Sequence, residues 1–204
     1  MSSAYFTFLA SSIRFALTII LTLACSQASA QNASPTAVVQ AMVGPVLSML
    51  KDPNFSVEEA QEEISATVKK AFDSRAVAQS VLSTNWRQAS KEQQDEFELL
   101  FAEILENTYI GRLEAYTNEV VEYSGEDIRN NRSTVNTLVI TESADIPVNY
   151  KLRLRSDGWF IYDVEIENVS MVSSYRETYR SVVRSSGMDG LLTQMRDKIA
   201  ELEQ

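Results

Sequence analysis

Two consecutive segments of alternating apolar and polar residues constrain the fold of this chain more than any other feature. Residues 146–154 and 160–166 place an apolar side chain at every second position, which is the spacing of a β-strand with one buried face. The residues Ser156-Asp157-Gly158 between them predict a tight turn and an antiparallel hairpin. The regions before residue 120 and after residue 168 have helical periodicity instead. The predicted fold class is therefore α+β.

The turn length decides which side chains of this hairpin share a face. We expect a three-residue loop with Gly158 in the left-handed conformation, because that loop places the apolar residues of both strands on one face. The expected pairs are Leu154 with Phe160, Leu152 with Tyr162, Tyr150 with Val164 and Val148 with Ile166, with Lys151 opposite Asp163 on the outer face. A two-residue loop would instead set Leu152 opposite Asp163.

Further elements extend the sheet and surround it with helices. A strand at about residues 133–141 adds Val135, Thr137 and Val139 to the inner face, and residues 120–130 have room for a fourth strand. We therefore predict a curved antiparallel sheet of three to four strands packed by several helices. Helices are predicted to begin at the N-cap Ser34, at the capping box of Ser56, at Asp73 and at the capping box of Ser90, and two more cover residues 169–185 and 190–202.

The first 30 residues are predicted to be an export signal that is removed. Arg14 precedes the apolar run 15–24, which is too short to span a bilayer, and Ala28-Ser29-Ala30 forms a cleavage site after Ala30. Residues 31–204 then form a single domain, with a helical half at about 34–118 and a sheet with C-terminal helices at about 120–204. Lipidation at Cys25 is an alternative, although Thr22 stands where lipoprotein signals usually have leucine.

Composition and motifs disfavour most enzymes and nucleic-acid partners. The chain has no histidine, which is the usual general base and the commonest metal ligand, and its formal net charge of −10 disfavours binding to phosphate backbones. Asp163, Glu165 and Glu167 form a carboxylate row, but Lys151, Arg153 and Arg155 on the paired strand make a solvated ion-pair surface the better interpretation. Trp159 is expected to pair with Arg155 on the same outer face.

Two ordered sets of motifs stand out in this chain. The motifs of the first half are Phe72-Asp73-Ser74-Arg75, Val81-Leu82, Trp86-Arg87-Gln88-Ala89-Ser90, Gln93, Phe97, Phe101 and Thr108-Tyr109. Those of the second half are Asp157-Gly158-Trp159-Phe160-Ile161-Tyr162-Asp163-Val164, Ile166-Glu167-Asn168-Val169-Ser170-Met171-Val172 and Tyr175-Arg176. Together, in this order, they resemble the MlaC family, the auxiliary periplasmic component of toluene-tolerance type ABC transporters. The chain departs from the family pattern at Ser83 and Asn168, where the family usually has glycine, and at Ser174, where it usually has asparagine.

The resemblance implies a periplasmic phospholipid carrier with an NTF2-like fold that encloses an apolar lipid cavity. Family members are expected to move phospholipid between an outer-membrane lipoprotein complex and the MCE-domain subunit of an inner-membrane ABC transporter, which maintains outer-membrane lipid asymmetry. Such a carrier has no catalytic residue, no metal and no cofactor besides the phospholipid it holds as cargo. It is expected to contact membranes only transiently and to bind no nucleic acid.

We expect the cavity to lie between the longest helix and the inner face of the sheet. Its candidate lining consists of Phe101, Leu105, Tyr109, Leu113, Val148, Tyr150, Leu152, Tyr162, Val164, Ile166, Val169, Met171, Val172 and Tyr175. Two acyl chains would need roughly 1,000 Å³, at the upper end of ordinary ligand pockets. A filled core has the same sequence pattern, so each of these residues could equally be core. Arg112 and Arg176 are candidates for a phosphate contact.

Two other functions fit the sequence. An NTF2-like enzyme acting on a small apolar substrate would use Asp163 or Tyr162 as acid or base, with the carboxylate facing a pocket. A periplasmic adaptor without lipid would have a solid core and act only through protein contacts. An interior cavity and bound diacyl lipid distinguish the carrier from both.

Overall fold

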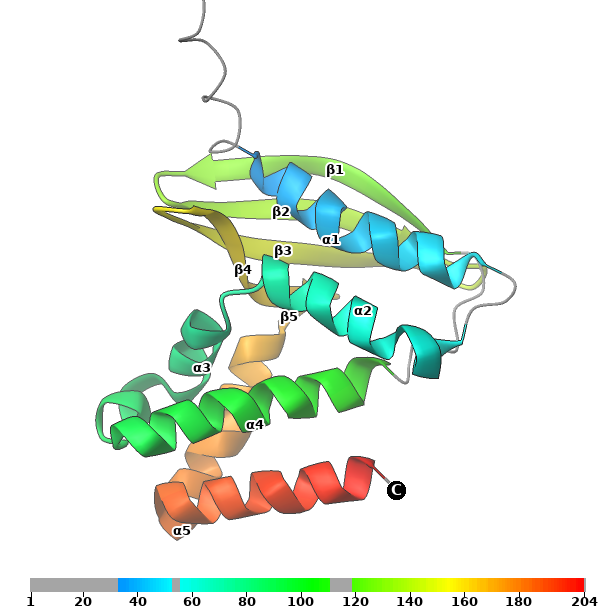
Figure 1. The fold of residues 1–204 in the computed structure, drawn as a ribbon. Coiled ribbons are helices and arrows are strands. Elements are labelled where there is room, and N and C mark those ends of the chain that lie inside the picture. Colours follow the sequence, from blue (N-terminus) through cyan, green and yellow to red (C-terminus); the bar gives the residue numbers. More distant parts are fainter. Residues whose placement is uncertain (1–32, 53–55, 111–118, 204) are drawn as a thin grey trace, which may run out of the picture. The chain divides into compact units, whose positions relative to one another are not determined.

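The computed structural model describes residues 33–52, 56–110 and 119–203, which form helices on one side of an antiparallel sheet. The helices are α1 (Pro35–Leu50), α2 (Val57–Ala71), α3 (Ser74–Leu82), α4 (Lys91–Ile110) and α5 (Met171–Leu202), with a short 3-10 helix η1 (Ser83–Arg87) after α3. The strands β1 (Val120–Arg129), β2 (Arg132–Ile140), β3 (Asp145–Arg155), β4 (Gly158–Ile166) and β5 (Val169–Ser170) follow chain order across a curved sheet (Figure 1). The predicted α+β class is confirmed, and the two-residue β5 extends the sheet beyond the expected strands.

Side-chain caps begin α1, α3 and α4 where the sequence predicted them. Ser34 caps α1. The carboxylate of Asp73 accepts a hydrogen bond of 3.0 Å from the backbone amide of Ala76 and so begins α3. At α4, the backbone amide of Ser90 donates to Gln93 Oε1 at 3.0 Å, and the amide of Gln93 donates to Ser90 Oγ at 3.2 Å. These reciprocal bonds form a capping box and satisfy amides that have no partner within the helix.

The hairpin of β3 and β4 confirms one half of the predicted register and corrects the other. The pairs Val148–Ile166, Tyr150–Val164 and Lys151–Asp163 are as expected. A register shift then places Leu152 opposite Ile161, so Tyr162 is the extra residue of a β-bulge, and the loop has two residues because Arg155 pairs with Gly158. The predicted pairs of Leu152 with Tyr162 and Leu154 with Phe160 are therefore wrong. The bulge lets a two-residue loop avoid setting Leu152 against Asp163.

The bulge also changes the faces of the residues next to the turn. Ile161 is fully buried in the sheet interior, and Trp159 packs against the same interior. The guanidinium of Arg155 lies 5.5 Å from the ring centre of Phe160. The predicted pair of Trp159 with Arg155 on the outer face is therefore wrong, because one inserted residue reverses the alternation on the turn side of the bulge.

The C-terminal helical region differs from the prediction at its start, whereas its division into two helices is confirmed. Val169 belongs to β5, and the helix begins at Met171. The two predicted helices are the two segments of α5, which meet at a kink at Gly187, where φ is 71° and ψ is −177° and the backbone is not helical (Figure 1). Glycine adopts a positive φ without steric cost, so the bend needs no separate loop.

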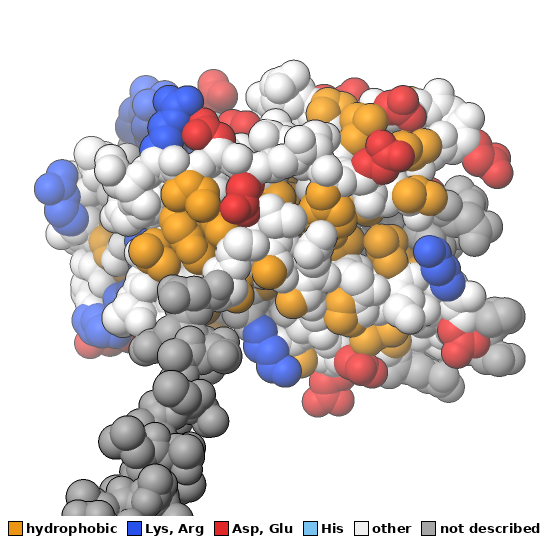
Figure 2. Space-filling model, turned by 90° about the horizontal axis from the view of Figure 1, so that it is seen from above, with side chains coloured by type: hydrophobic (Ala, Val, Ile, Leu, Met, Phe, Trp, Pro, Cys, Tyr) orange, Lys and Arg blue, Asp and Glu red, His pale blue; other side chains and the backbone are white. Residues whose placement is uncertain are grey.

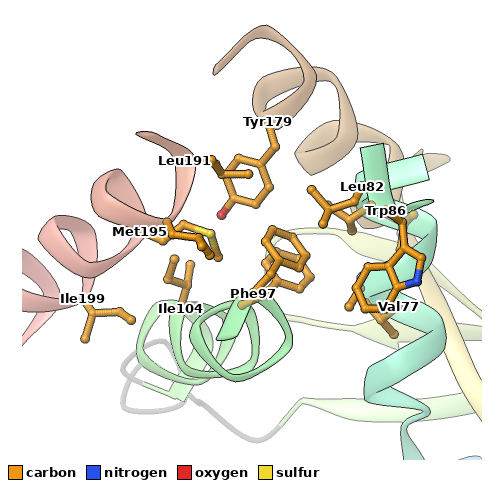
Figure 3. Close-up of a cluster of buried hydrophobic side chains, with 14 residues drawn as sticks. Val77, Leu82, Trp86, Phe97, Ile104, Tyr179, Leu191, Met195 and Ile199 are labelled. Atoms are coloured by element: carbon orange, nitrogen blue, oxygen red, sulfur yellow. The ribbon is translucent and has the colours of Figure 1, made fainter. Parts of the chain in front are cut away.

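Two apolar clusters fill the described part of the molecule. The helical cluster joins α3, η1, α4 and α5, and Figure 3 shows its side chains converging from these helices: Val77, Leu82, Trp86, Phe97, Ile104, Tyr179, Leu191, Met195 and Ile199. The sheet cluster joins α1 and the end of α2 to the sheet through Val39, Met42, Ala71, Val135, Leu152 and Ile161. The helix that covers the sheet interior is therefore α1, whereas α4 packs against α3 and α5 (Figure 1).

The surface above α1 and β1 mixes apolar and charged side chains. Figure 2 shows hydrophobic side chains in a broken band, with Asp, Glu, Lys and Arg side chains around it. Among the residues that the structure describes, no helix is both long and apolar enough to cross a membrane.

Candidate functional site

A pocket of about 650 Å³ lies where α1, α2 and α4 meet the inner face of the sheet at one end of its strands. Its lining is largely aliphatic and aromatic. Helices α1 to α4, with Phe72 between α2 and α3, contribute Met42, Val43, Val46, Leu47, Leu50, Ile64, Ser65, Val68, Lys69, Phe72, Ser74, Val77, Glu98, Phe101, Ala102, Leu105, Glu106 and Tyr109. The sheet and the segments beside it contribute Glu119, Val121, Val139, Val164, Ile166 and Met171. Its size and apolar lining are those of a site for a hydrophobic ligand.

Helical periodicity explains why α4 can serve both the helical cluster and the pocket. Phe97 and Ile104 face α5, whereas Ala102, Leu105 and Glu106 face the pocket. Phe101 belongs to both, because its ring stacks on Phe97 at 5.6 Å and also forms part of the pocket wall. The broad apolar stripe of this helix therefore packs on two sides.

Six of the fourteen residues predicted to contact lipid line this pocket. They are Phe101, Leu105 and Tyr109 of α4, Val164 and Ile166 of β4, and Met171 at the start of α5. The structure thus brings the long helix, the last long strand and the following helix together around one space.

Most of the remaining candidates lie in the packed interior. Val148 and Leu152 are buried at 9% and 0% exposure, and Tyr150 packs against the sheet cluster. Burial raises the pKa of Tyr150 to about 12, so its phenol stays neutral. Val172 is a core residue of the helical cluster, and Tyr175 packs against that cluster. These residues share the apolar spacing of the lining, and packing alone separates the two groups.

Three predicted positions remain. The hydroxyl of Tyr162 accepts a hydrogen bond of 2.9 Å from Arg132, and Val169 is 61% exposed. Neither side chain lines the pocket. Leu113 lies outside the described residues, so its predicted contact with lipid stays a prediction.

The sequence reasoning missed the walls made by α1 and α2. Val43, Val46, Leu47 and Leu50 of α1 line the pocket together with Ile64, Val68 and Phe72 at α2. Their helical spacing was visible in the sequence, but spacing does not tell which neighbour a helix faces. The volume of about 650 Å³ is below the roughly 1,000 Å³ that two acyl chains would need. Val39 and Met42 of α1 pack against the sheet beside this space.

Charged side chains occupy one part of the lining. The Lys69 ammonium of α2 forms an ion pair of 3.0 Å with Glu106 of α4, and Arg75 pairs with Glu98 at 2.9 Å. The side chain of Lys69 is 60% exposed and that of Glu106 is 21% exposed. The ion pair of Lys69 and Glu106 therefore lies at the solvent side of the pocket and joins α2 to α4.

The carboxylate row on β4 is structural, and it is less solvated than the sequence suggested. Asp163 is only 5% exposed and accepts hydrogen bonds from Ser170 Oγ at 2.7 Å and from the backbone amide of Val172 at 3.1 Å. Lys151 pairs with Asp163 at 3.6 Å and with Glu165. Asp163 therefore holds the start of α5 against β4. Neither Asp163 nor Tyr162 lines the pocket, contrary to what the enzyme alternative requires.

The two arginines considered for a phosphate contact do not lie in the described lining. Arg176 Nε donates a 2.7 Å hydrogen bond to the backbone carbonyl of Ser80 and so ties α5 to α3. Arg112 lies outside the described residues. No group of three or more acidic, cysteine or histidine side chains in the described ranges could hold a metal ion.

Comparison with known proteins places this geometry in a family. The family model described as "MlaC protein" matches residues 40–197. The intermembrane phospholipid transport system binding protein MlaC of Haemophilus influenzae is 23% identical over 157 residues, which cover 74% of this chain and 72% of that protein. A phospholipid-binding protein from Ralstonia solanacearum, solved in complex with a phospholipid, has a TM-score of 0.77 and 23% identity over 84% of this chain and all of that one. The family model spans most of the chain, and the chain therefore belongs to the MlaC family.

Proposed function

We propose that this protein is a phospholipid carrier that holds acyl chains in the pocket between α1, α2, α4 and the sheet. The apolar pocket of about 650 Å³ is the observation that carries the proposal. Membership in the MlaC family and the phospholipid bound to the Ralstonia protein of the same fold support it.

The energetics of lipid transfer explain why such a pocket is needed. A phospholipid has around thirty chain methylenes, and exposing them to water costs on the order of 25 kcal/mol at about 0.8 kcal/mol each. A pocket that matches the bilayer as an apolar solvent removes this barrier and lets loading and unloading stay near balance. Moderate affinity relative to the bilayer is therefore a requirement of the function.

The proposed setting is the periplasm, with residues 1–30 removed as an export signal and residues 31–204 forming the carrier domain. The proposed partners are the MCE-domain subunit of an inner-membrane ABC transporter and an outer-membrane lipoprotein complex, and the proposed result is maintained lipid asymmetry of the outer membrane. The name of the Haemophilus relative, which places it in an intermembrane phospholipid transport system, supports this assignment.

The carrier function requires no covalent chemistry. Asp163 and Tyr162, the candidates for an acid or base, bond to Ser170 and Arg132 away from the pocket lining. An adaptor with a solid core is disfavoured by the pocket itself. We therefore propose that the protein is not an enzyme and that phospholipid is its cargo.

Native mass spectrometry of the purified protein, followed by lipid extraction, tests the proposal. We expect a mass shift that corresponds to diacyl phospholipid and recovery of that lipid from the extract. Protein that carries no lipid, and takes up none from phospholipid vesicles, would contradict the carrier function.

A charged substitution in the pocket gives a second test. Val164→Arg places a cation in the apolar lining, so we expect loss of lipid retention without loss of the circular dichroism spectrum. Ile128→Arg is the matched control, because Ile128 is a strand residue that is 49% exposed on β1. Equal lipid content in both folded variants would remove Val164 from the site.

A further inference from the structure

Ser65 on α2 is a buried hydroxyl inside an apolar pocket. The residue is 7% exposed and lines the pocket, and its Oγ has no hydrogen-bond partner in the part of the chain that the structure describes. A buried hydroxyl without a partner is costly, and most such groups in folded proteins are bonded to protein or to ordered water. The lining around Ser65 is largely apolar and offers few groups to hold a water, so the occupant of the pocket is the natural partner. The position therefore calls for an oxygen acceptor supplied by the occupant of the pocket.

Lys69 provides a second polar group one helical turn further along α2. Residues four apart lie on the same face of a helix, about 6 Å apart along its axis. Both Ser65 and Lys69 belong to the pocket lining, but Lys69 is exposed and Ser65 is buried. Glu106 holds the Lys69 ammonium at the edge of the pocket, and an ammonium has three N–H donors for further partners.

This pair matches the order of polar groups in one class of lipid. In a glycerophospholipid with ester-linked chains, the ester carbonyls lie next to the acyl chains and the phosphate lies a few bonds further out. A buried hydroxyl that can donate therefore corresponds to a carbonyl, and an exposed ammonium corresponds to the phosphate. The neighbouring lining residues Ile64 and Val68 are apolar, as chain contacts require.

We propose that Ser65 Oγ donates a hydrogen bond to an ester carbonyl of the bound lipid while Lys69 contacts its phosphate. This assignment rests on the proposed carrier function and adds that the pocket distinguishes ester-linked phospholipid from lipids of equal chain length that lack the carbonyl or the phosphate. It also orients the lipid, with the chains pointing away from the edge marked by Lys69 and Glu106.

A competition between two lipids tests the role of Ser65. The purified protein is incubated with vesicles that contain equal amounts of dipalmitoyl phosphatidylcholine and its dihexadecyl ether analogue, then isolated again, and the retained lipids are quantified by mass spectrometry. We expect the ester-to-ether ratio to be roughly fivefold higher for the native protein than for Ser65→Ala, as one hydrogen bond predicts. Ser65→Cys keeps the side-chain shape but donates weakly, so its ratio should also fall.

The ester-to-ether experiment can contradict the Ser65 subsite and the carrier function independently of each other. Retention of neither lipid by the native protein would contradict the carrier function, whereas retention of both at a ratio that Ser65→Ala leaves unchanged would overturn the subsite alone. Ser48→Ala, on the exposed side of α1, is the matched control and should keep the native ratio.

A second competition addresses Lys69. The vesicles contain equal amounts of dipalmitoyl phosphatidylcholine and dipalmitoylglycerol. These two lipids have the same acyl chains and differ in the phosphocholine headgroup, which dipalmitoylglycerol lacks. We expect Lys69→Gln to lower the ratio of phospholipid to diacylglycerol about threefold, since a single exposed charge contributes modestly. Lys70→Gln changes the adjacent exposed lysine, which is outside the pocket lining, and should have no effect. If Lys69→Gln and Lys70→Gln lowered the ratio of phospholipid to diacylglycerol equally, the cause would be the net charge of the protein, and the proposed contact between Lys69 and the phosphate would be overturned.

Discussion

The two sides of α4 are built from the same kinds of residues, yet aromatic rings pack closely around Phe97 on one side, whereas the other side borders the apolar pocket. On the helical cluster side, Phe97 and Phe101 stack at 5.6 Å, and Tyr179 meets Phe97 edge-on at 5.8 Å. On the other side, Leu105 and Tyr109 face a pocket of about 650 Å³. The aromatic rings fill the space around Phe97, whereas α1 and α2 leave the space beside Leu105 partly open. An apolar side chain is therefore expected to be buried, but the packing of the neighbouring elements decides whether it borders a filled core or a pocket.

The largest expected effect comes from truncating the fully buried ring of Phe97 in the helical cluster. Phe97→Ala should lower the free energy of unfolding by about 4 kcal/mol, because it removes a fully buried ring and leaves a cavity. Leu105→Ala should cost only about 1 kcal/mol, since Leu105 already borders empty space. Urea denaturation of both variants provides the measurement. Similar losses of unfolding free energy in Phe97→Ala and Leu105→Ala would show that the two sides of α4 are packed equally well.

Adding volume should separate the regions in the opposite way. Ala78 of α3 is 1% exposed in the helical cluster, so Ala78→Phe should destabilise the protein by about 3 kcal/mol through overpacking. Ala102 lines the pocket, so Ala102→Phe should change stability by less than about 1 kcal/mol. Ala102→Phe should also lower the amount of lipid that co-purifies, as measured by extraction. A severe loss of stability in Ala102→Phe would mean that the pocket has no spare room.

Asp73 joins the start of α3, which packs in the helical cluster, to strands β3 and β4, and its removal should weaken that connection. Its backbone amide donates a 2.9 Å hydrogen bond to the carbonyl of Ile161, and its carboxylate, 1% exposed, pairs with Arg153 and Arg155. Asp73→Asn keeps a capping group but loses the charge, so we expect a loss of about 2 kcal/mol in the free energy of unfolding at neutral pH. Asp157→Asn, which changes a carboxylate that is 61% exposed, should cost under about 0.5 kcal/mol.

The pH dependence of stability sharpens this test. Burial on its own would raise the pKa of Asp73, but the Ala76 amide and the two arginines outweigh it and lower the pKa below the ordinary value of 3.8. The unfolded chain therefore binds the proton first, and the stabilisation is present above about pH 4 and lost as the pH falls through the lowered pKa. Asp73→Asn should remove this part of the acid sensitivity. An unchanged acid profile would contradict the assigned ion pairs.

The smallest expected effect is a gain in stability at the end of α3. Ser83 has φ 53° and Asn168 has φ 65°, and both stand where the sequence motif of the family usually has glycine. Ser83→Gly should raise the free energy of unfolding by about 1 kcal/mol because it relieves backbone strain. Ser80→Gly, within α3, should instead lower it by about 0.5 kcal/mol. Thermal unfolding that shows the same sign for both variants would exclude strain at Ser83.

Local signals predicted the helix starts and the topology of the sheet. The capping groups at Ser34, Asp73 and Ser90 lie within a few residues of the amides they bind, and the meander follows from short turns between alternating strands. The hairpin was the exception. Its apolar residues favoured a longer loop, but a bulge at Tyr162 restored the burial of Leu152 and Ile161 with a shorter one. A bulge leaves little trace in the pattern, since it only shifts alternation by one residue.

Sequence alone determined the elements of this protein, its α+β class and, through ordered motifs, its family. It also predicted the side of the molecule on which α4, β4 and the start of α5 meet. Tertiary structure alone decided that Leu105 and Val164 border a pocket while Leu152 and Val172 are solid core. All four are apolar and occupy positions expected to be buried, so their sequence patterns are alike. Whether space remains beside a buried side chain depends on how distant segments pack around it, as α1 and α2 do here.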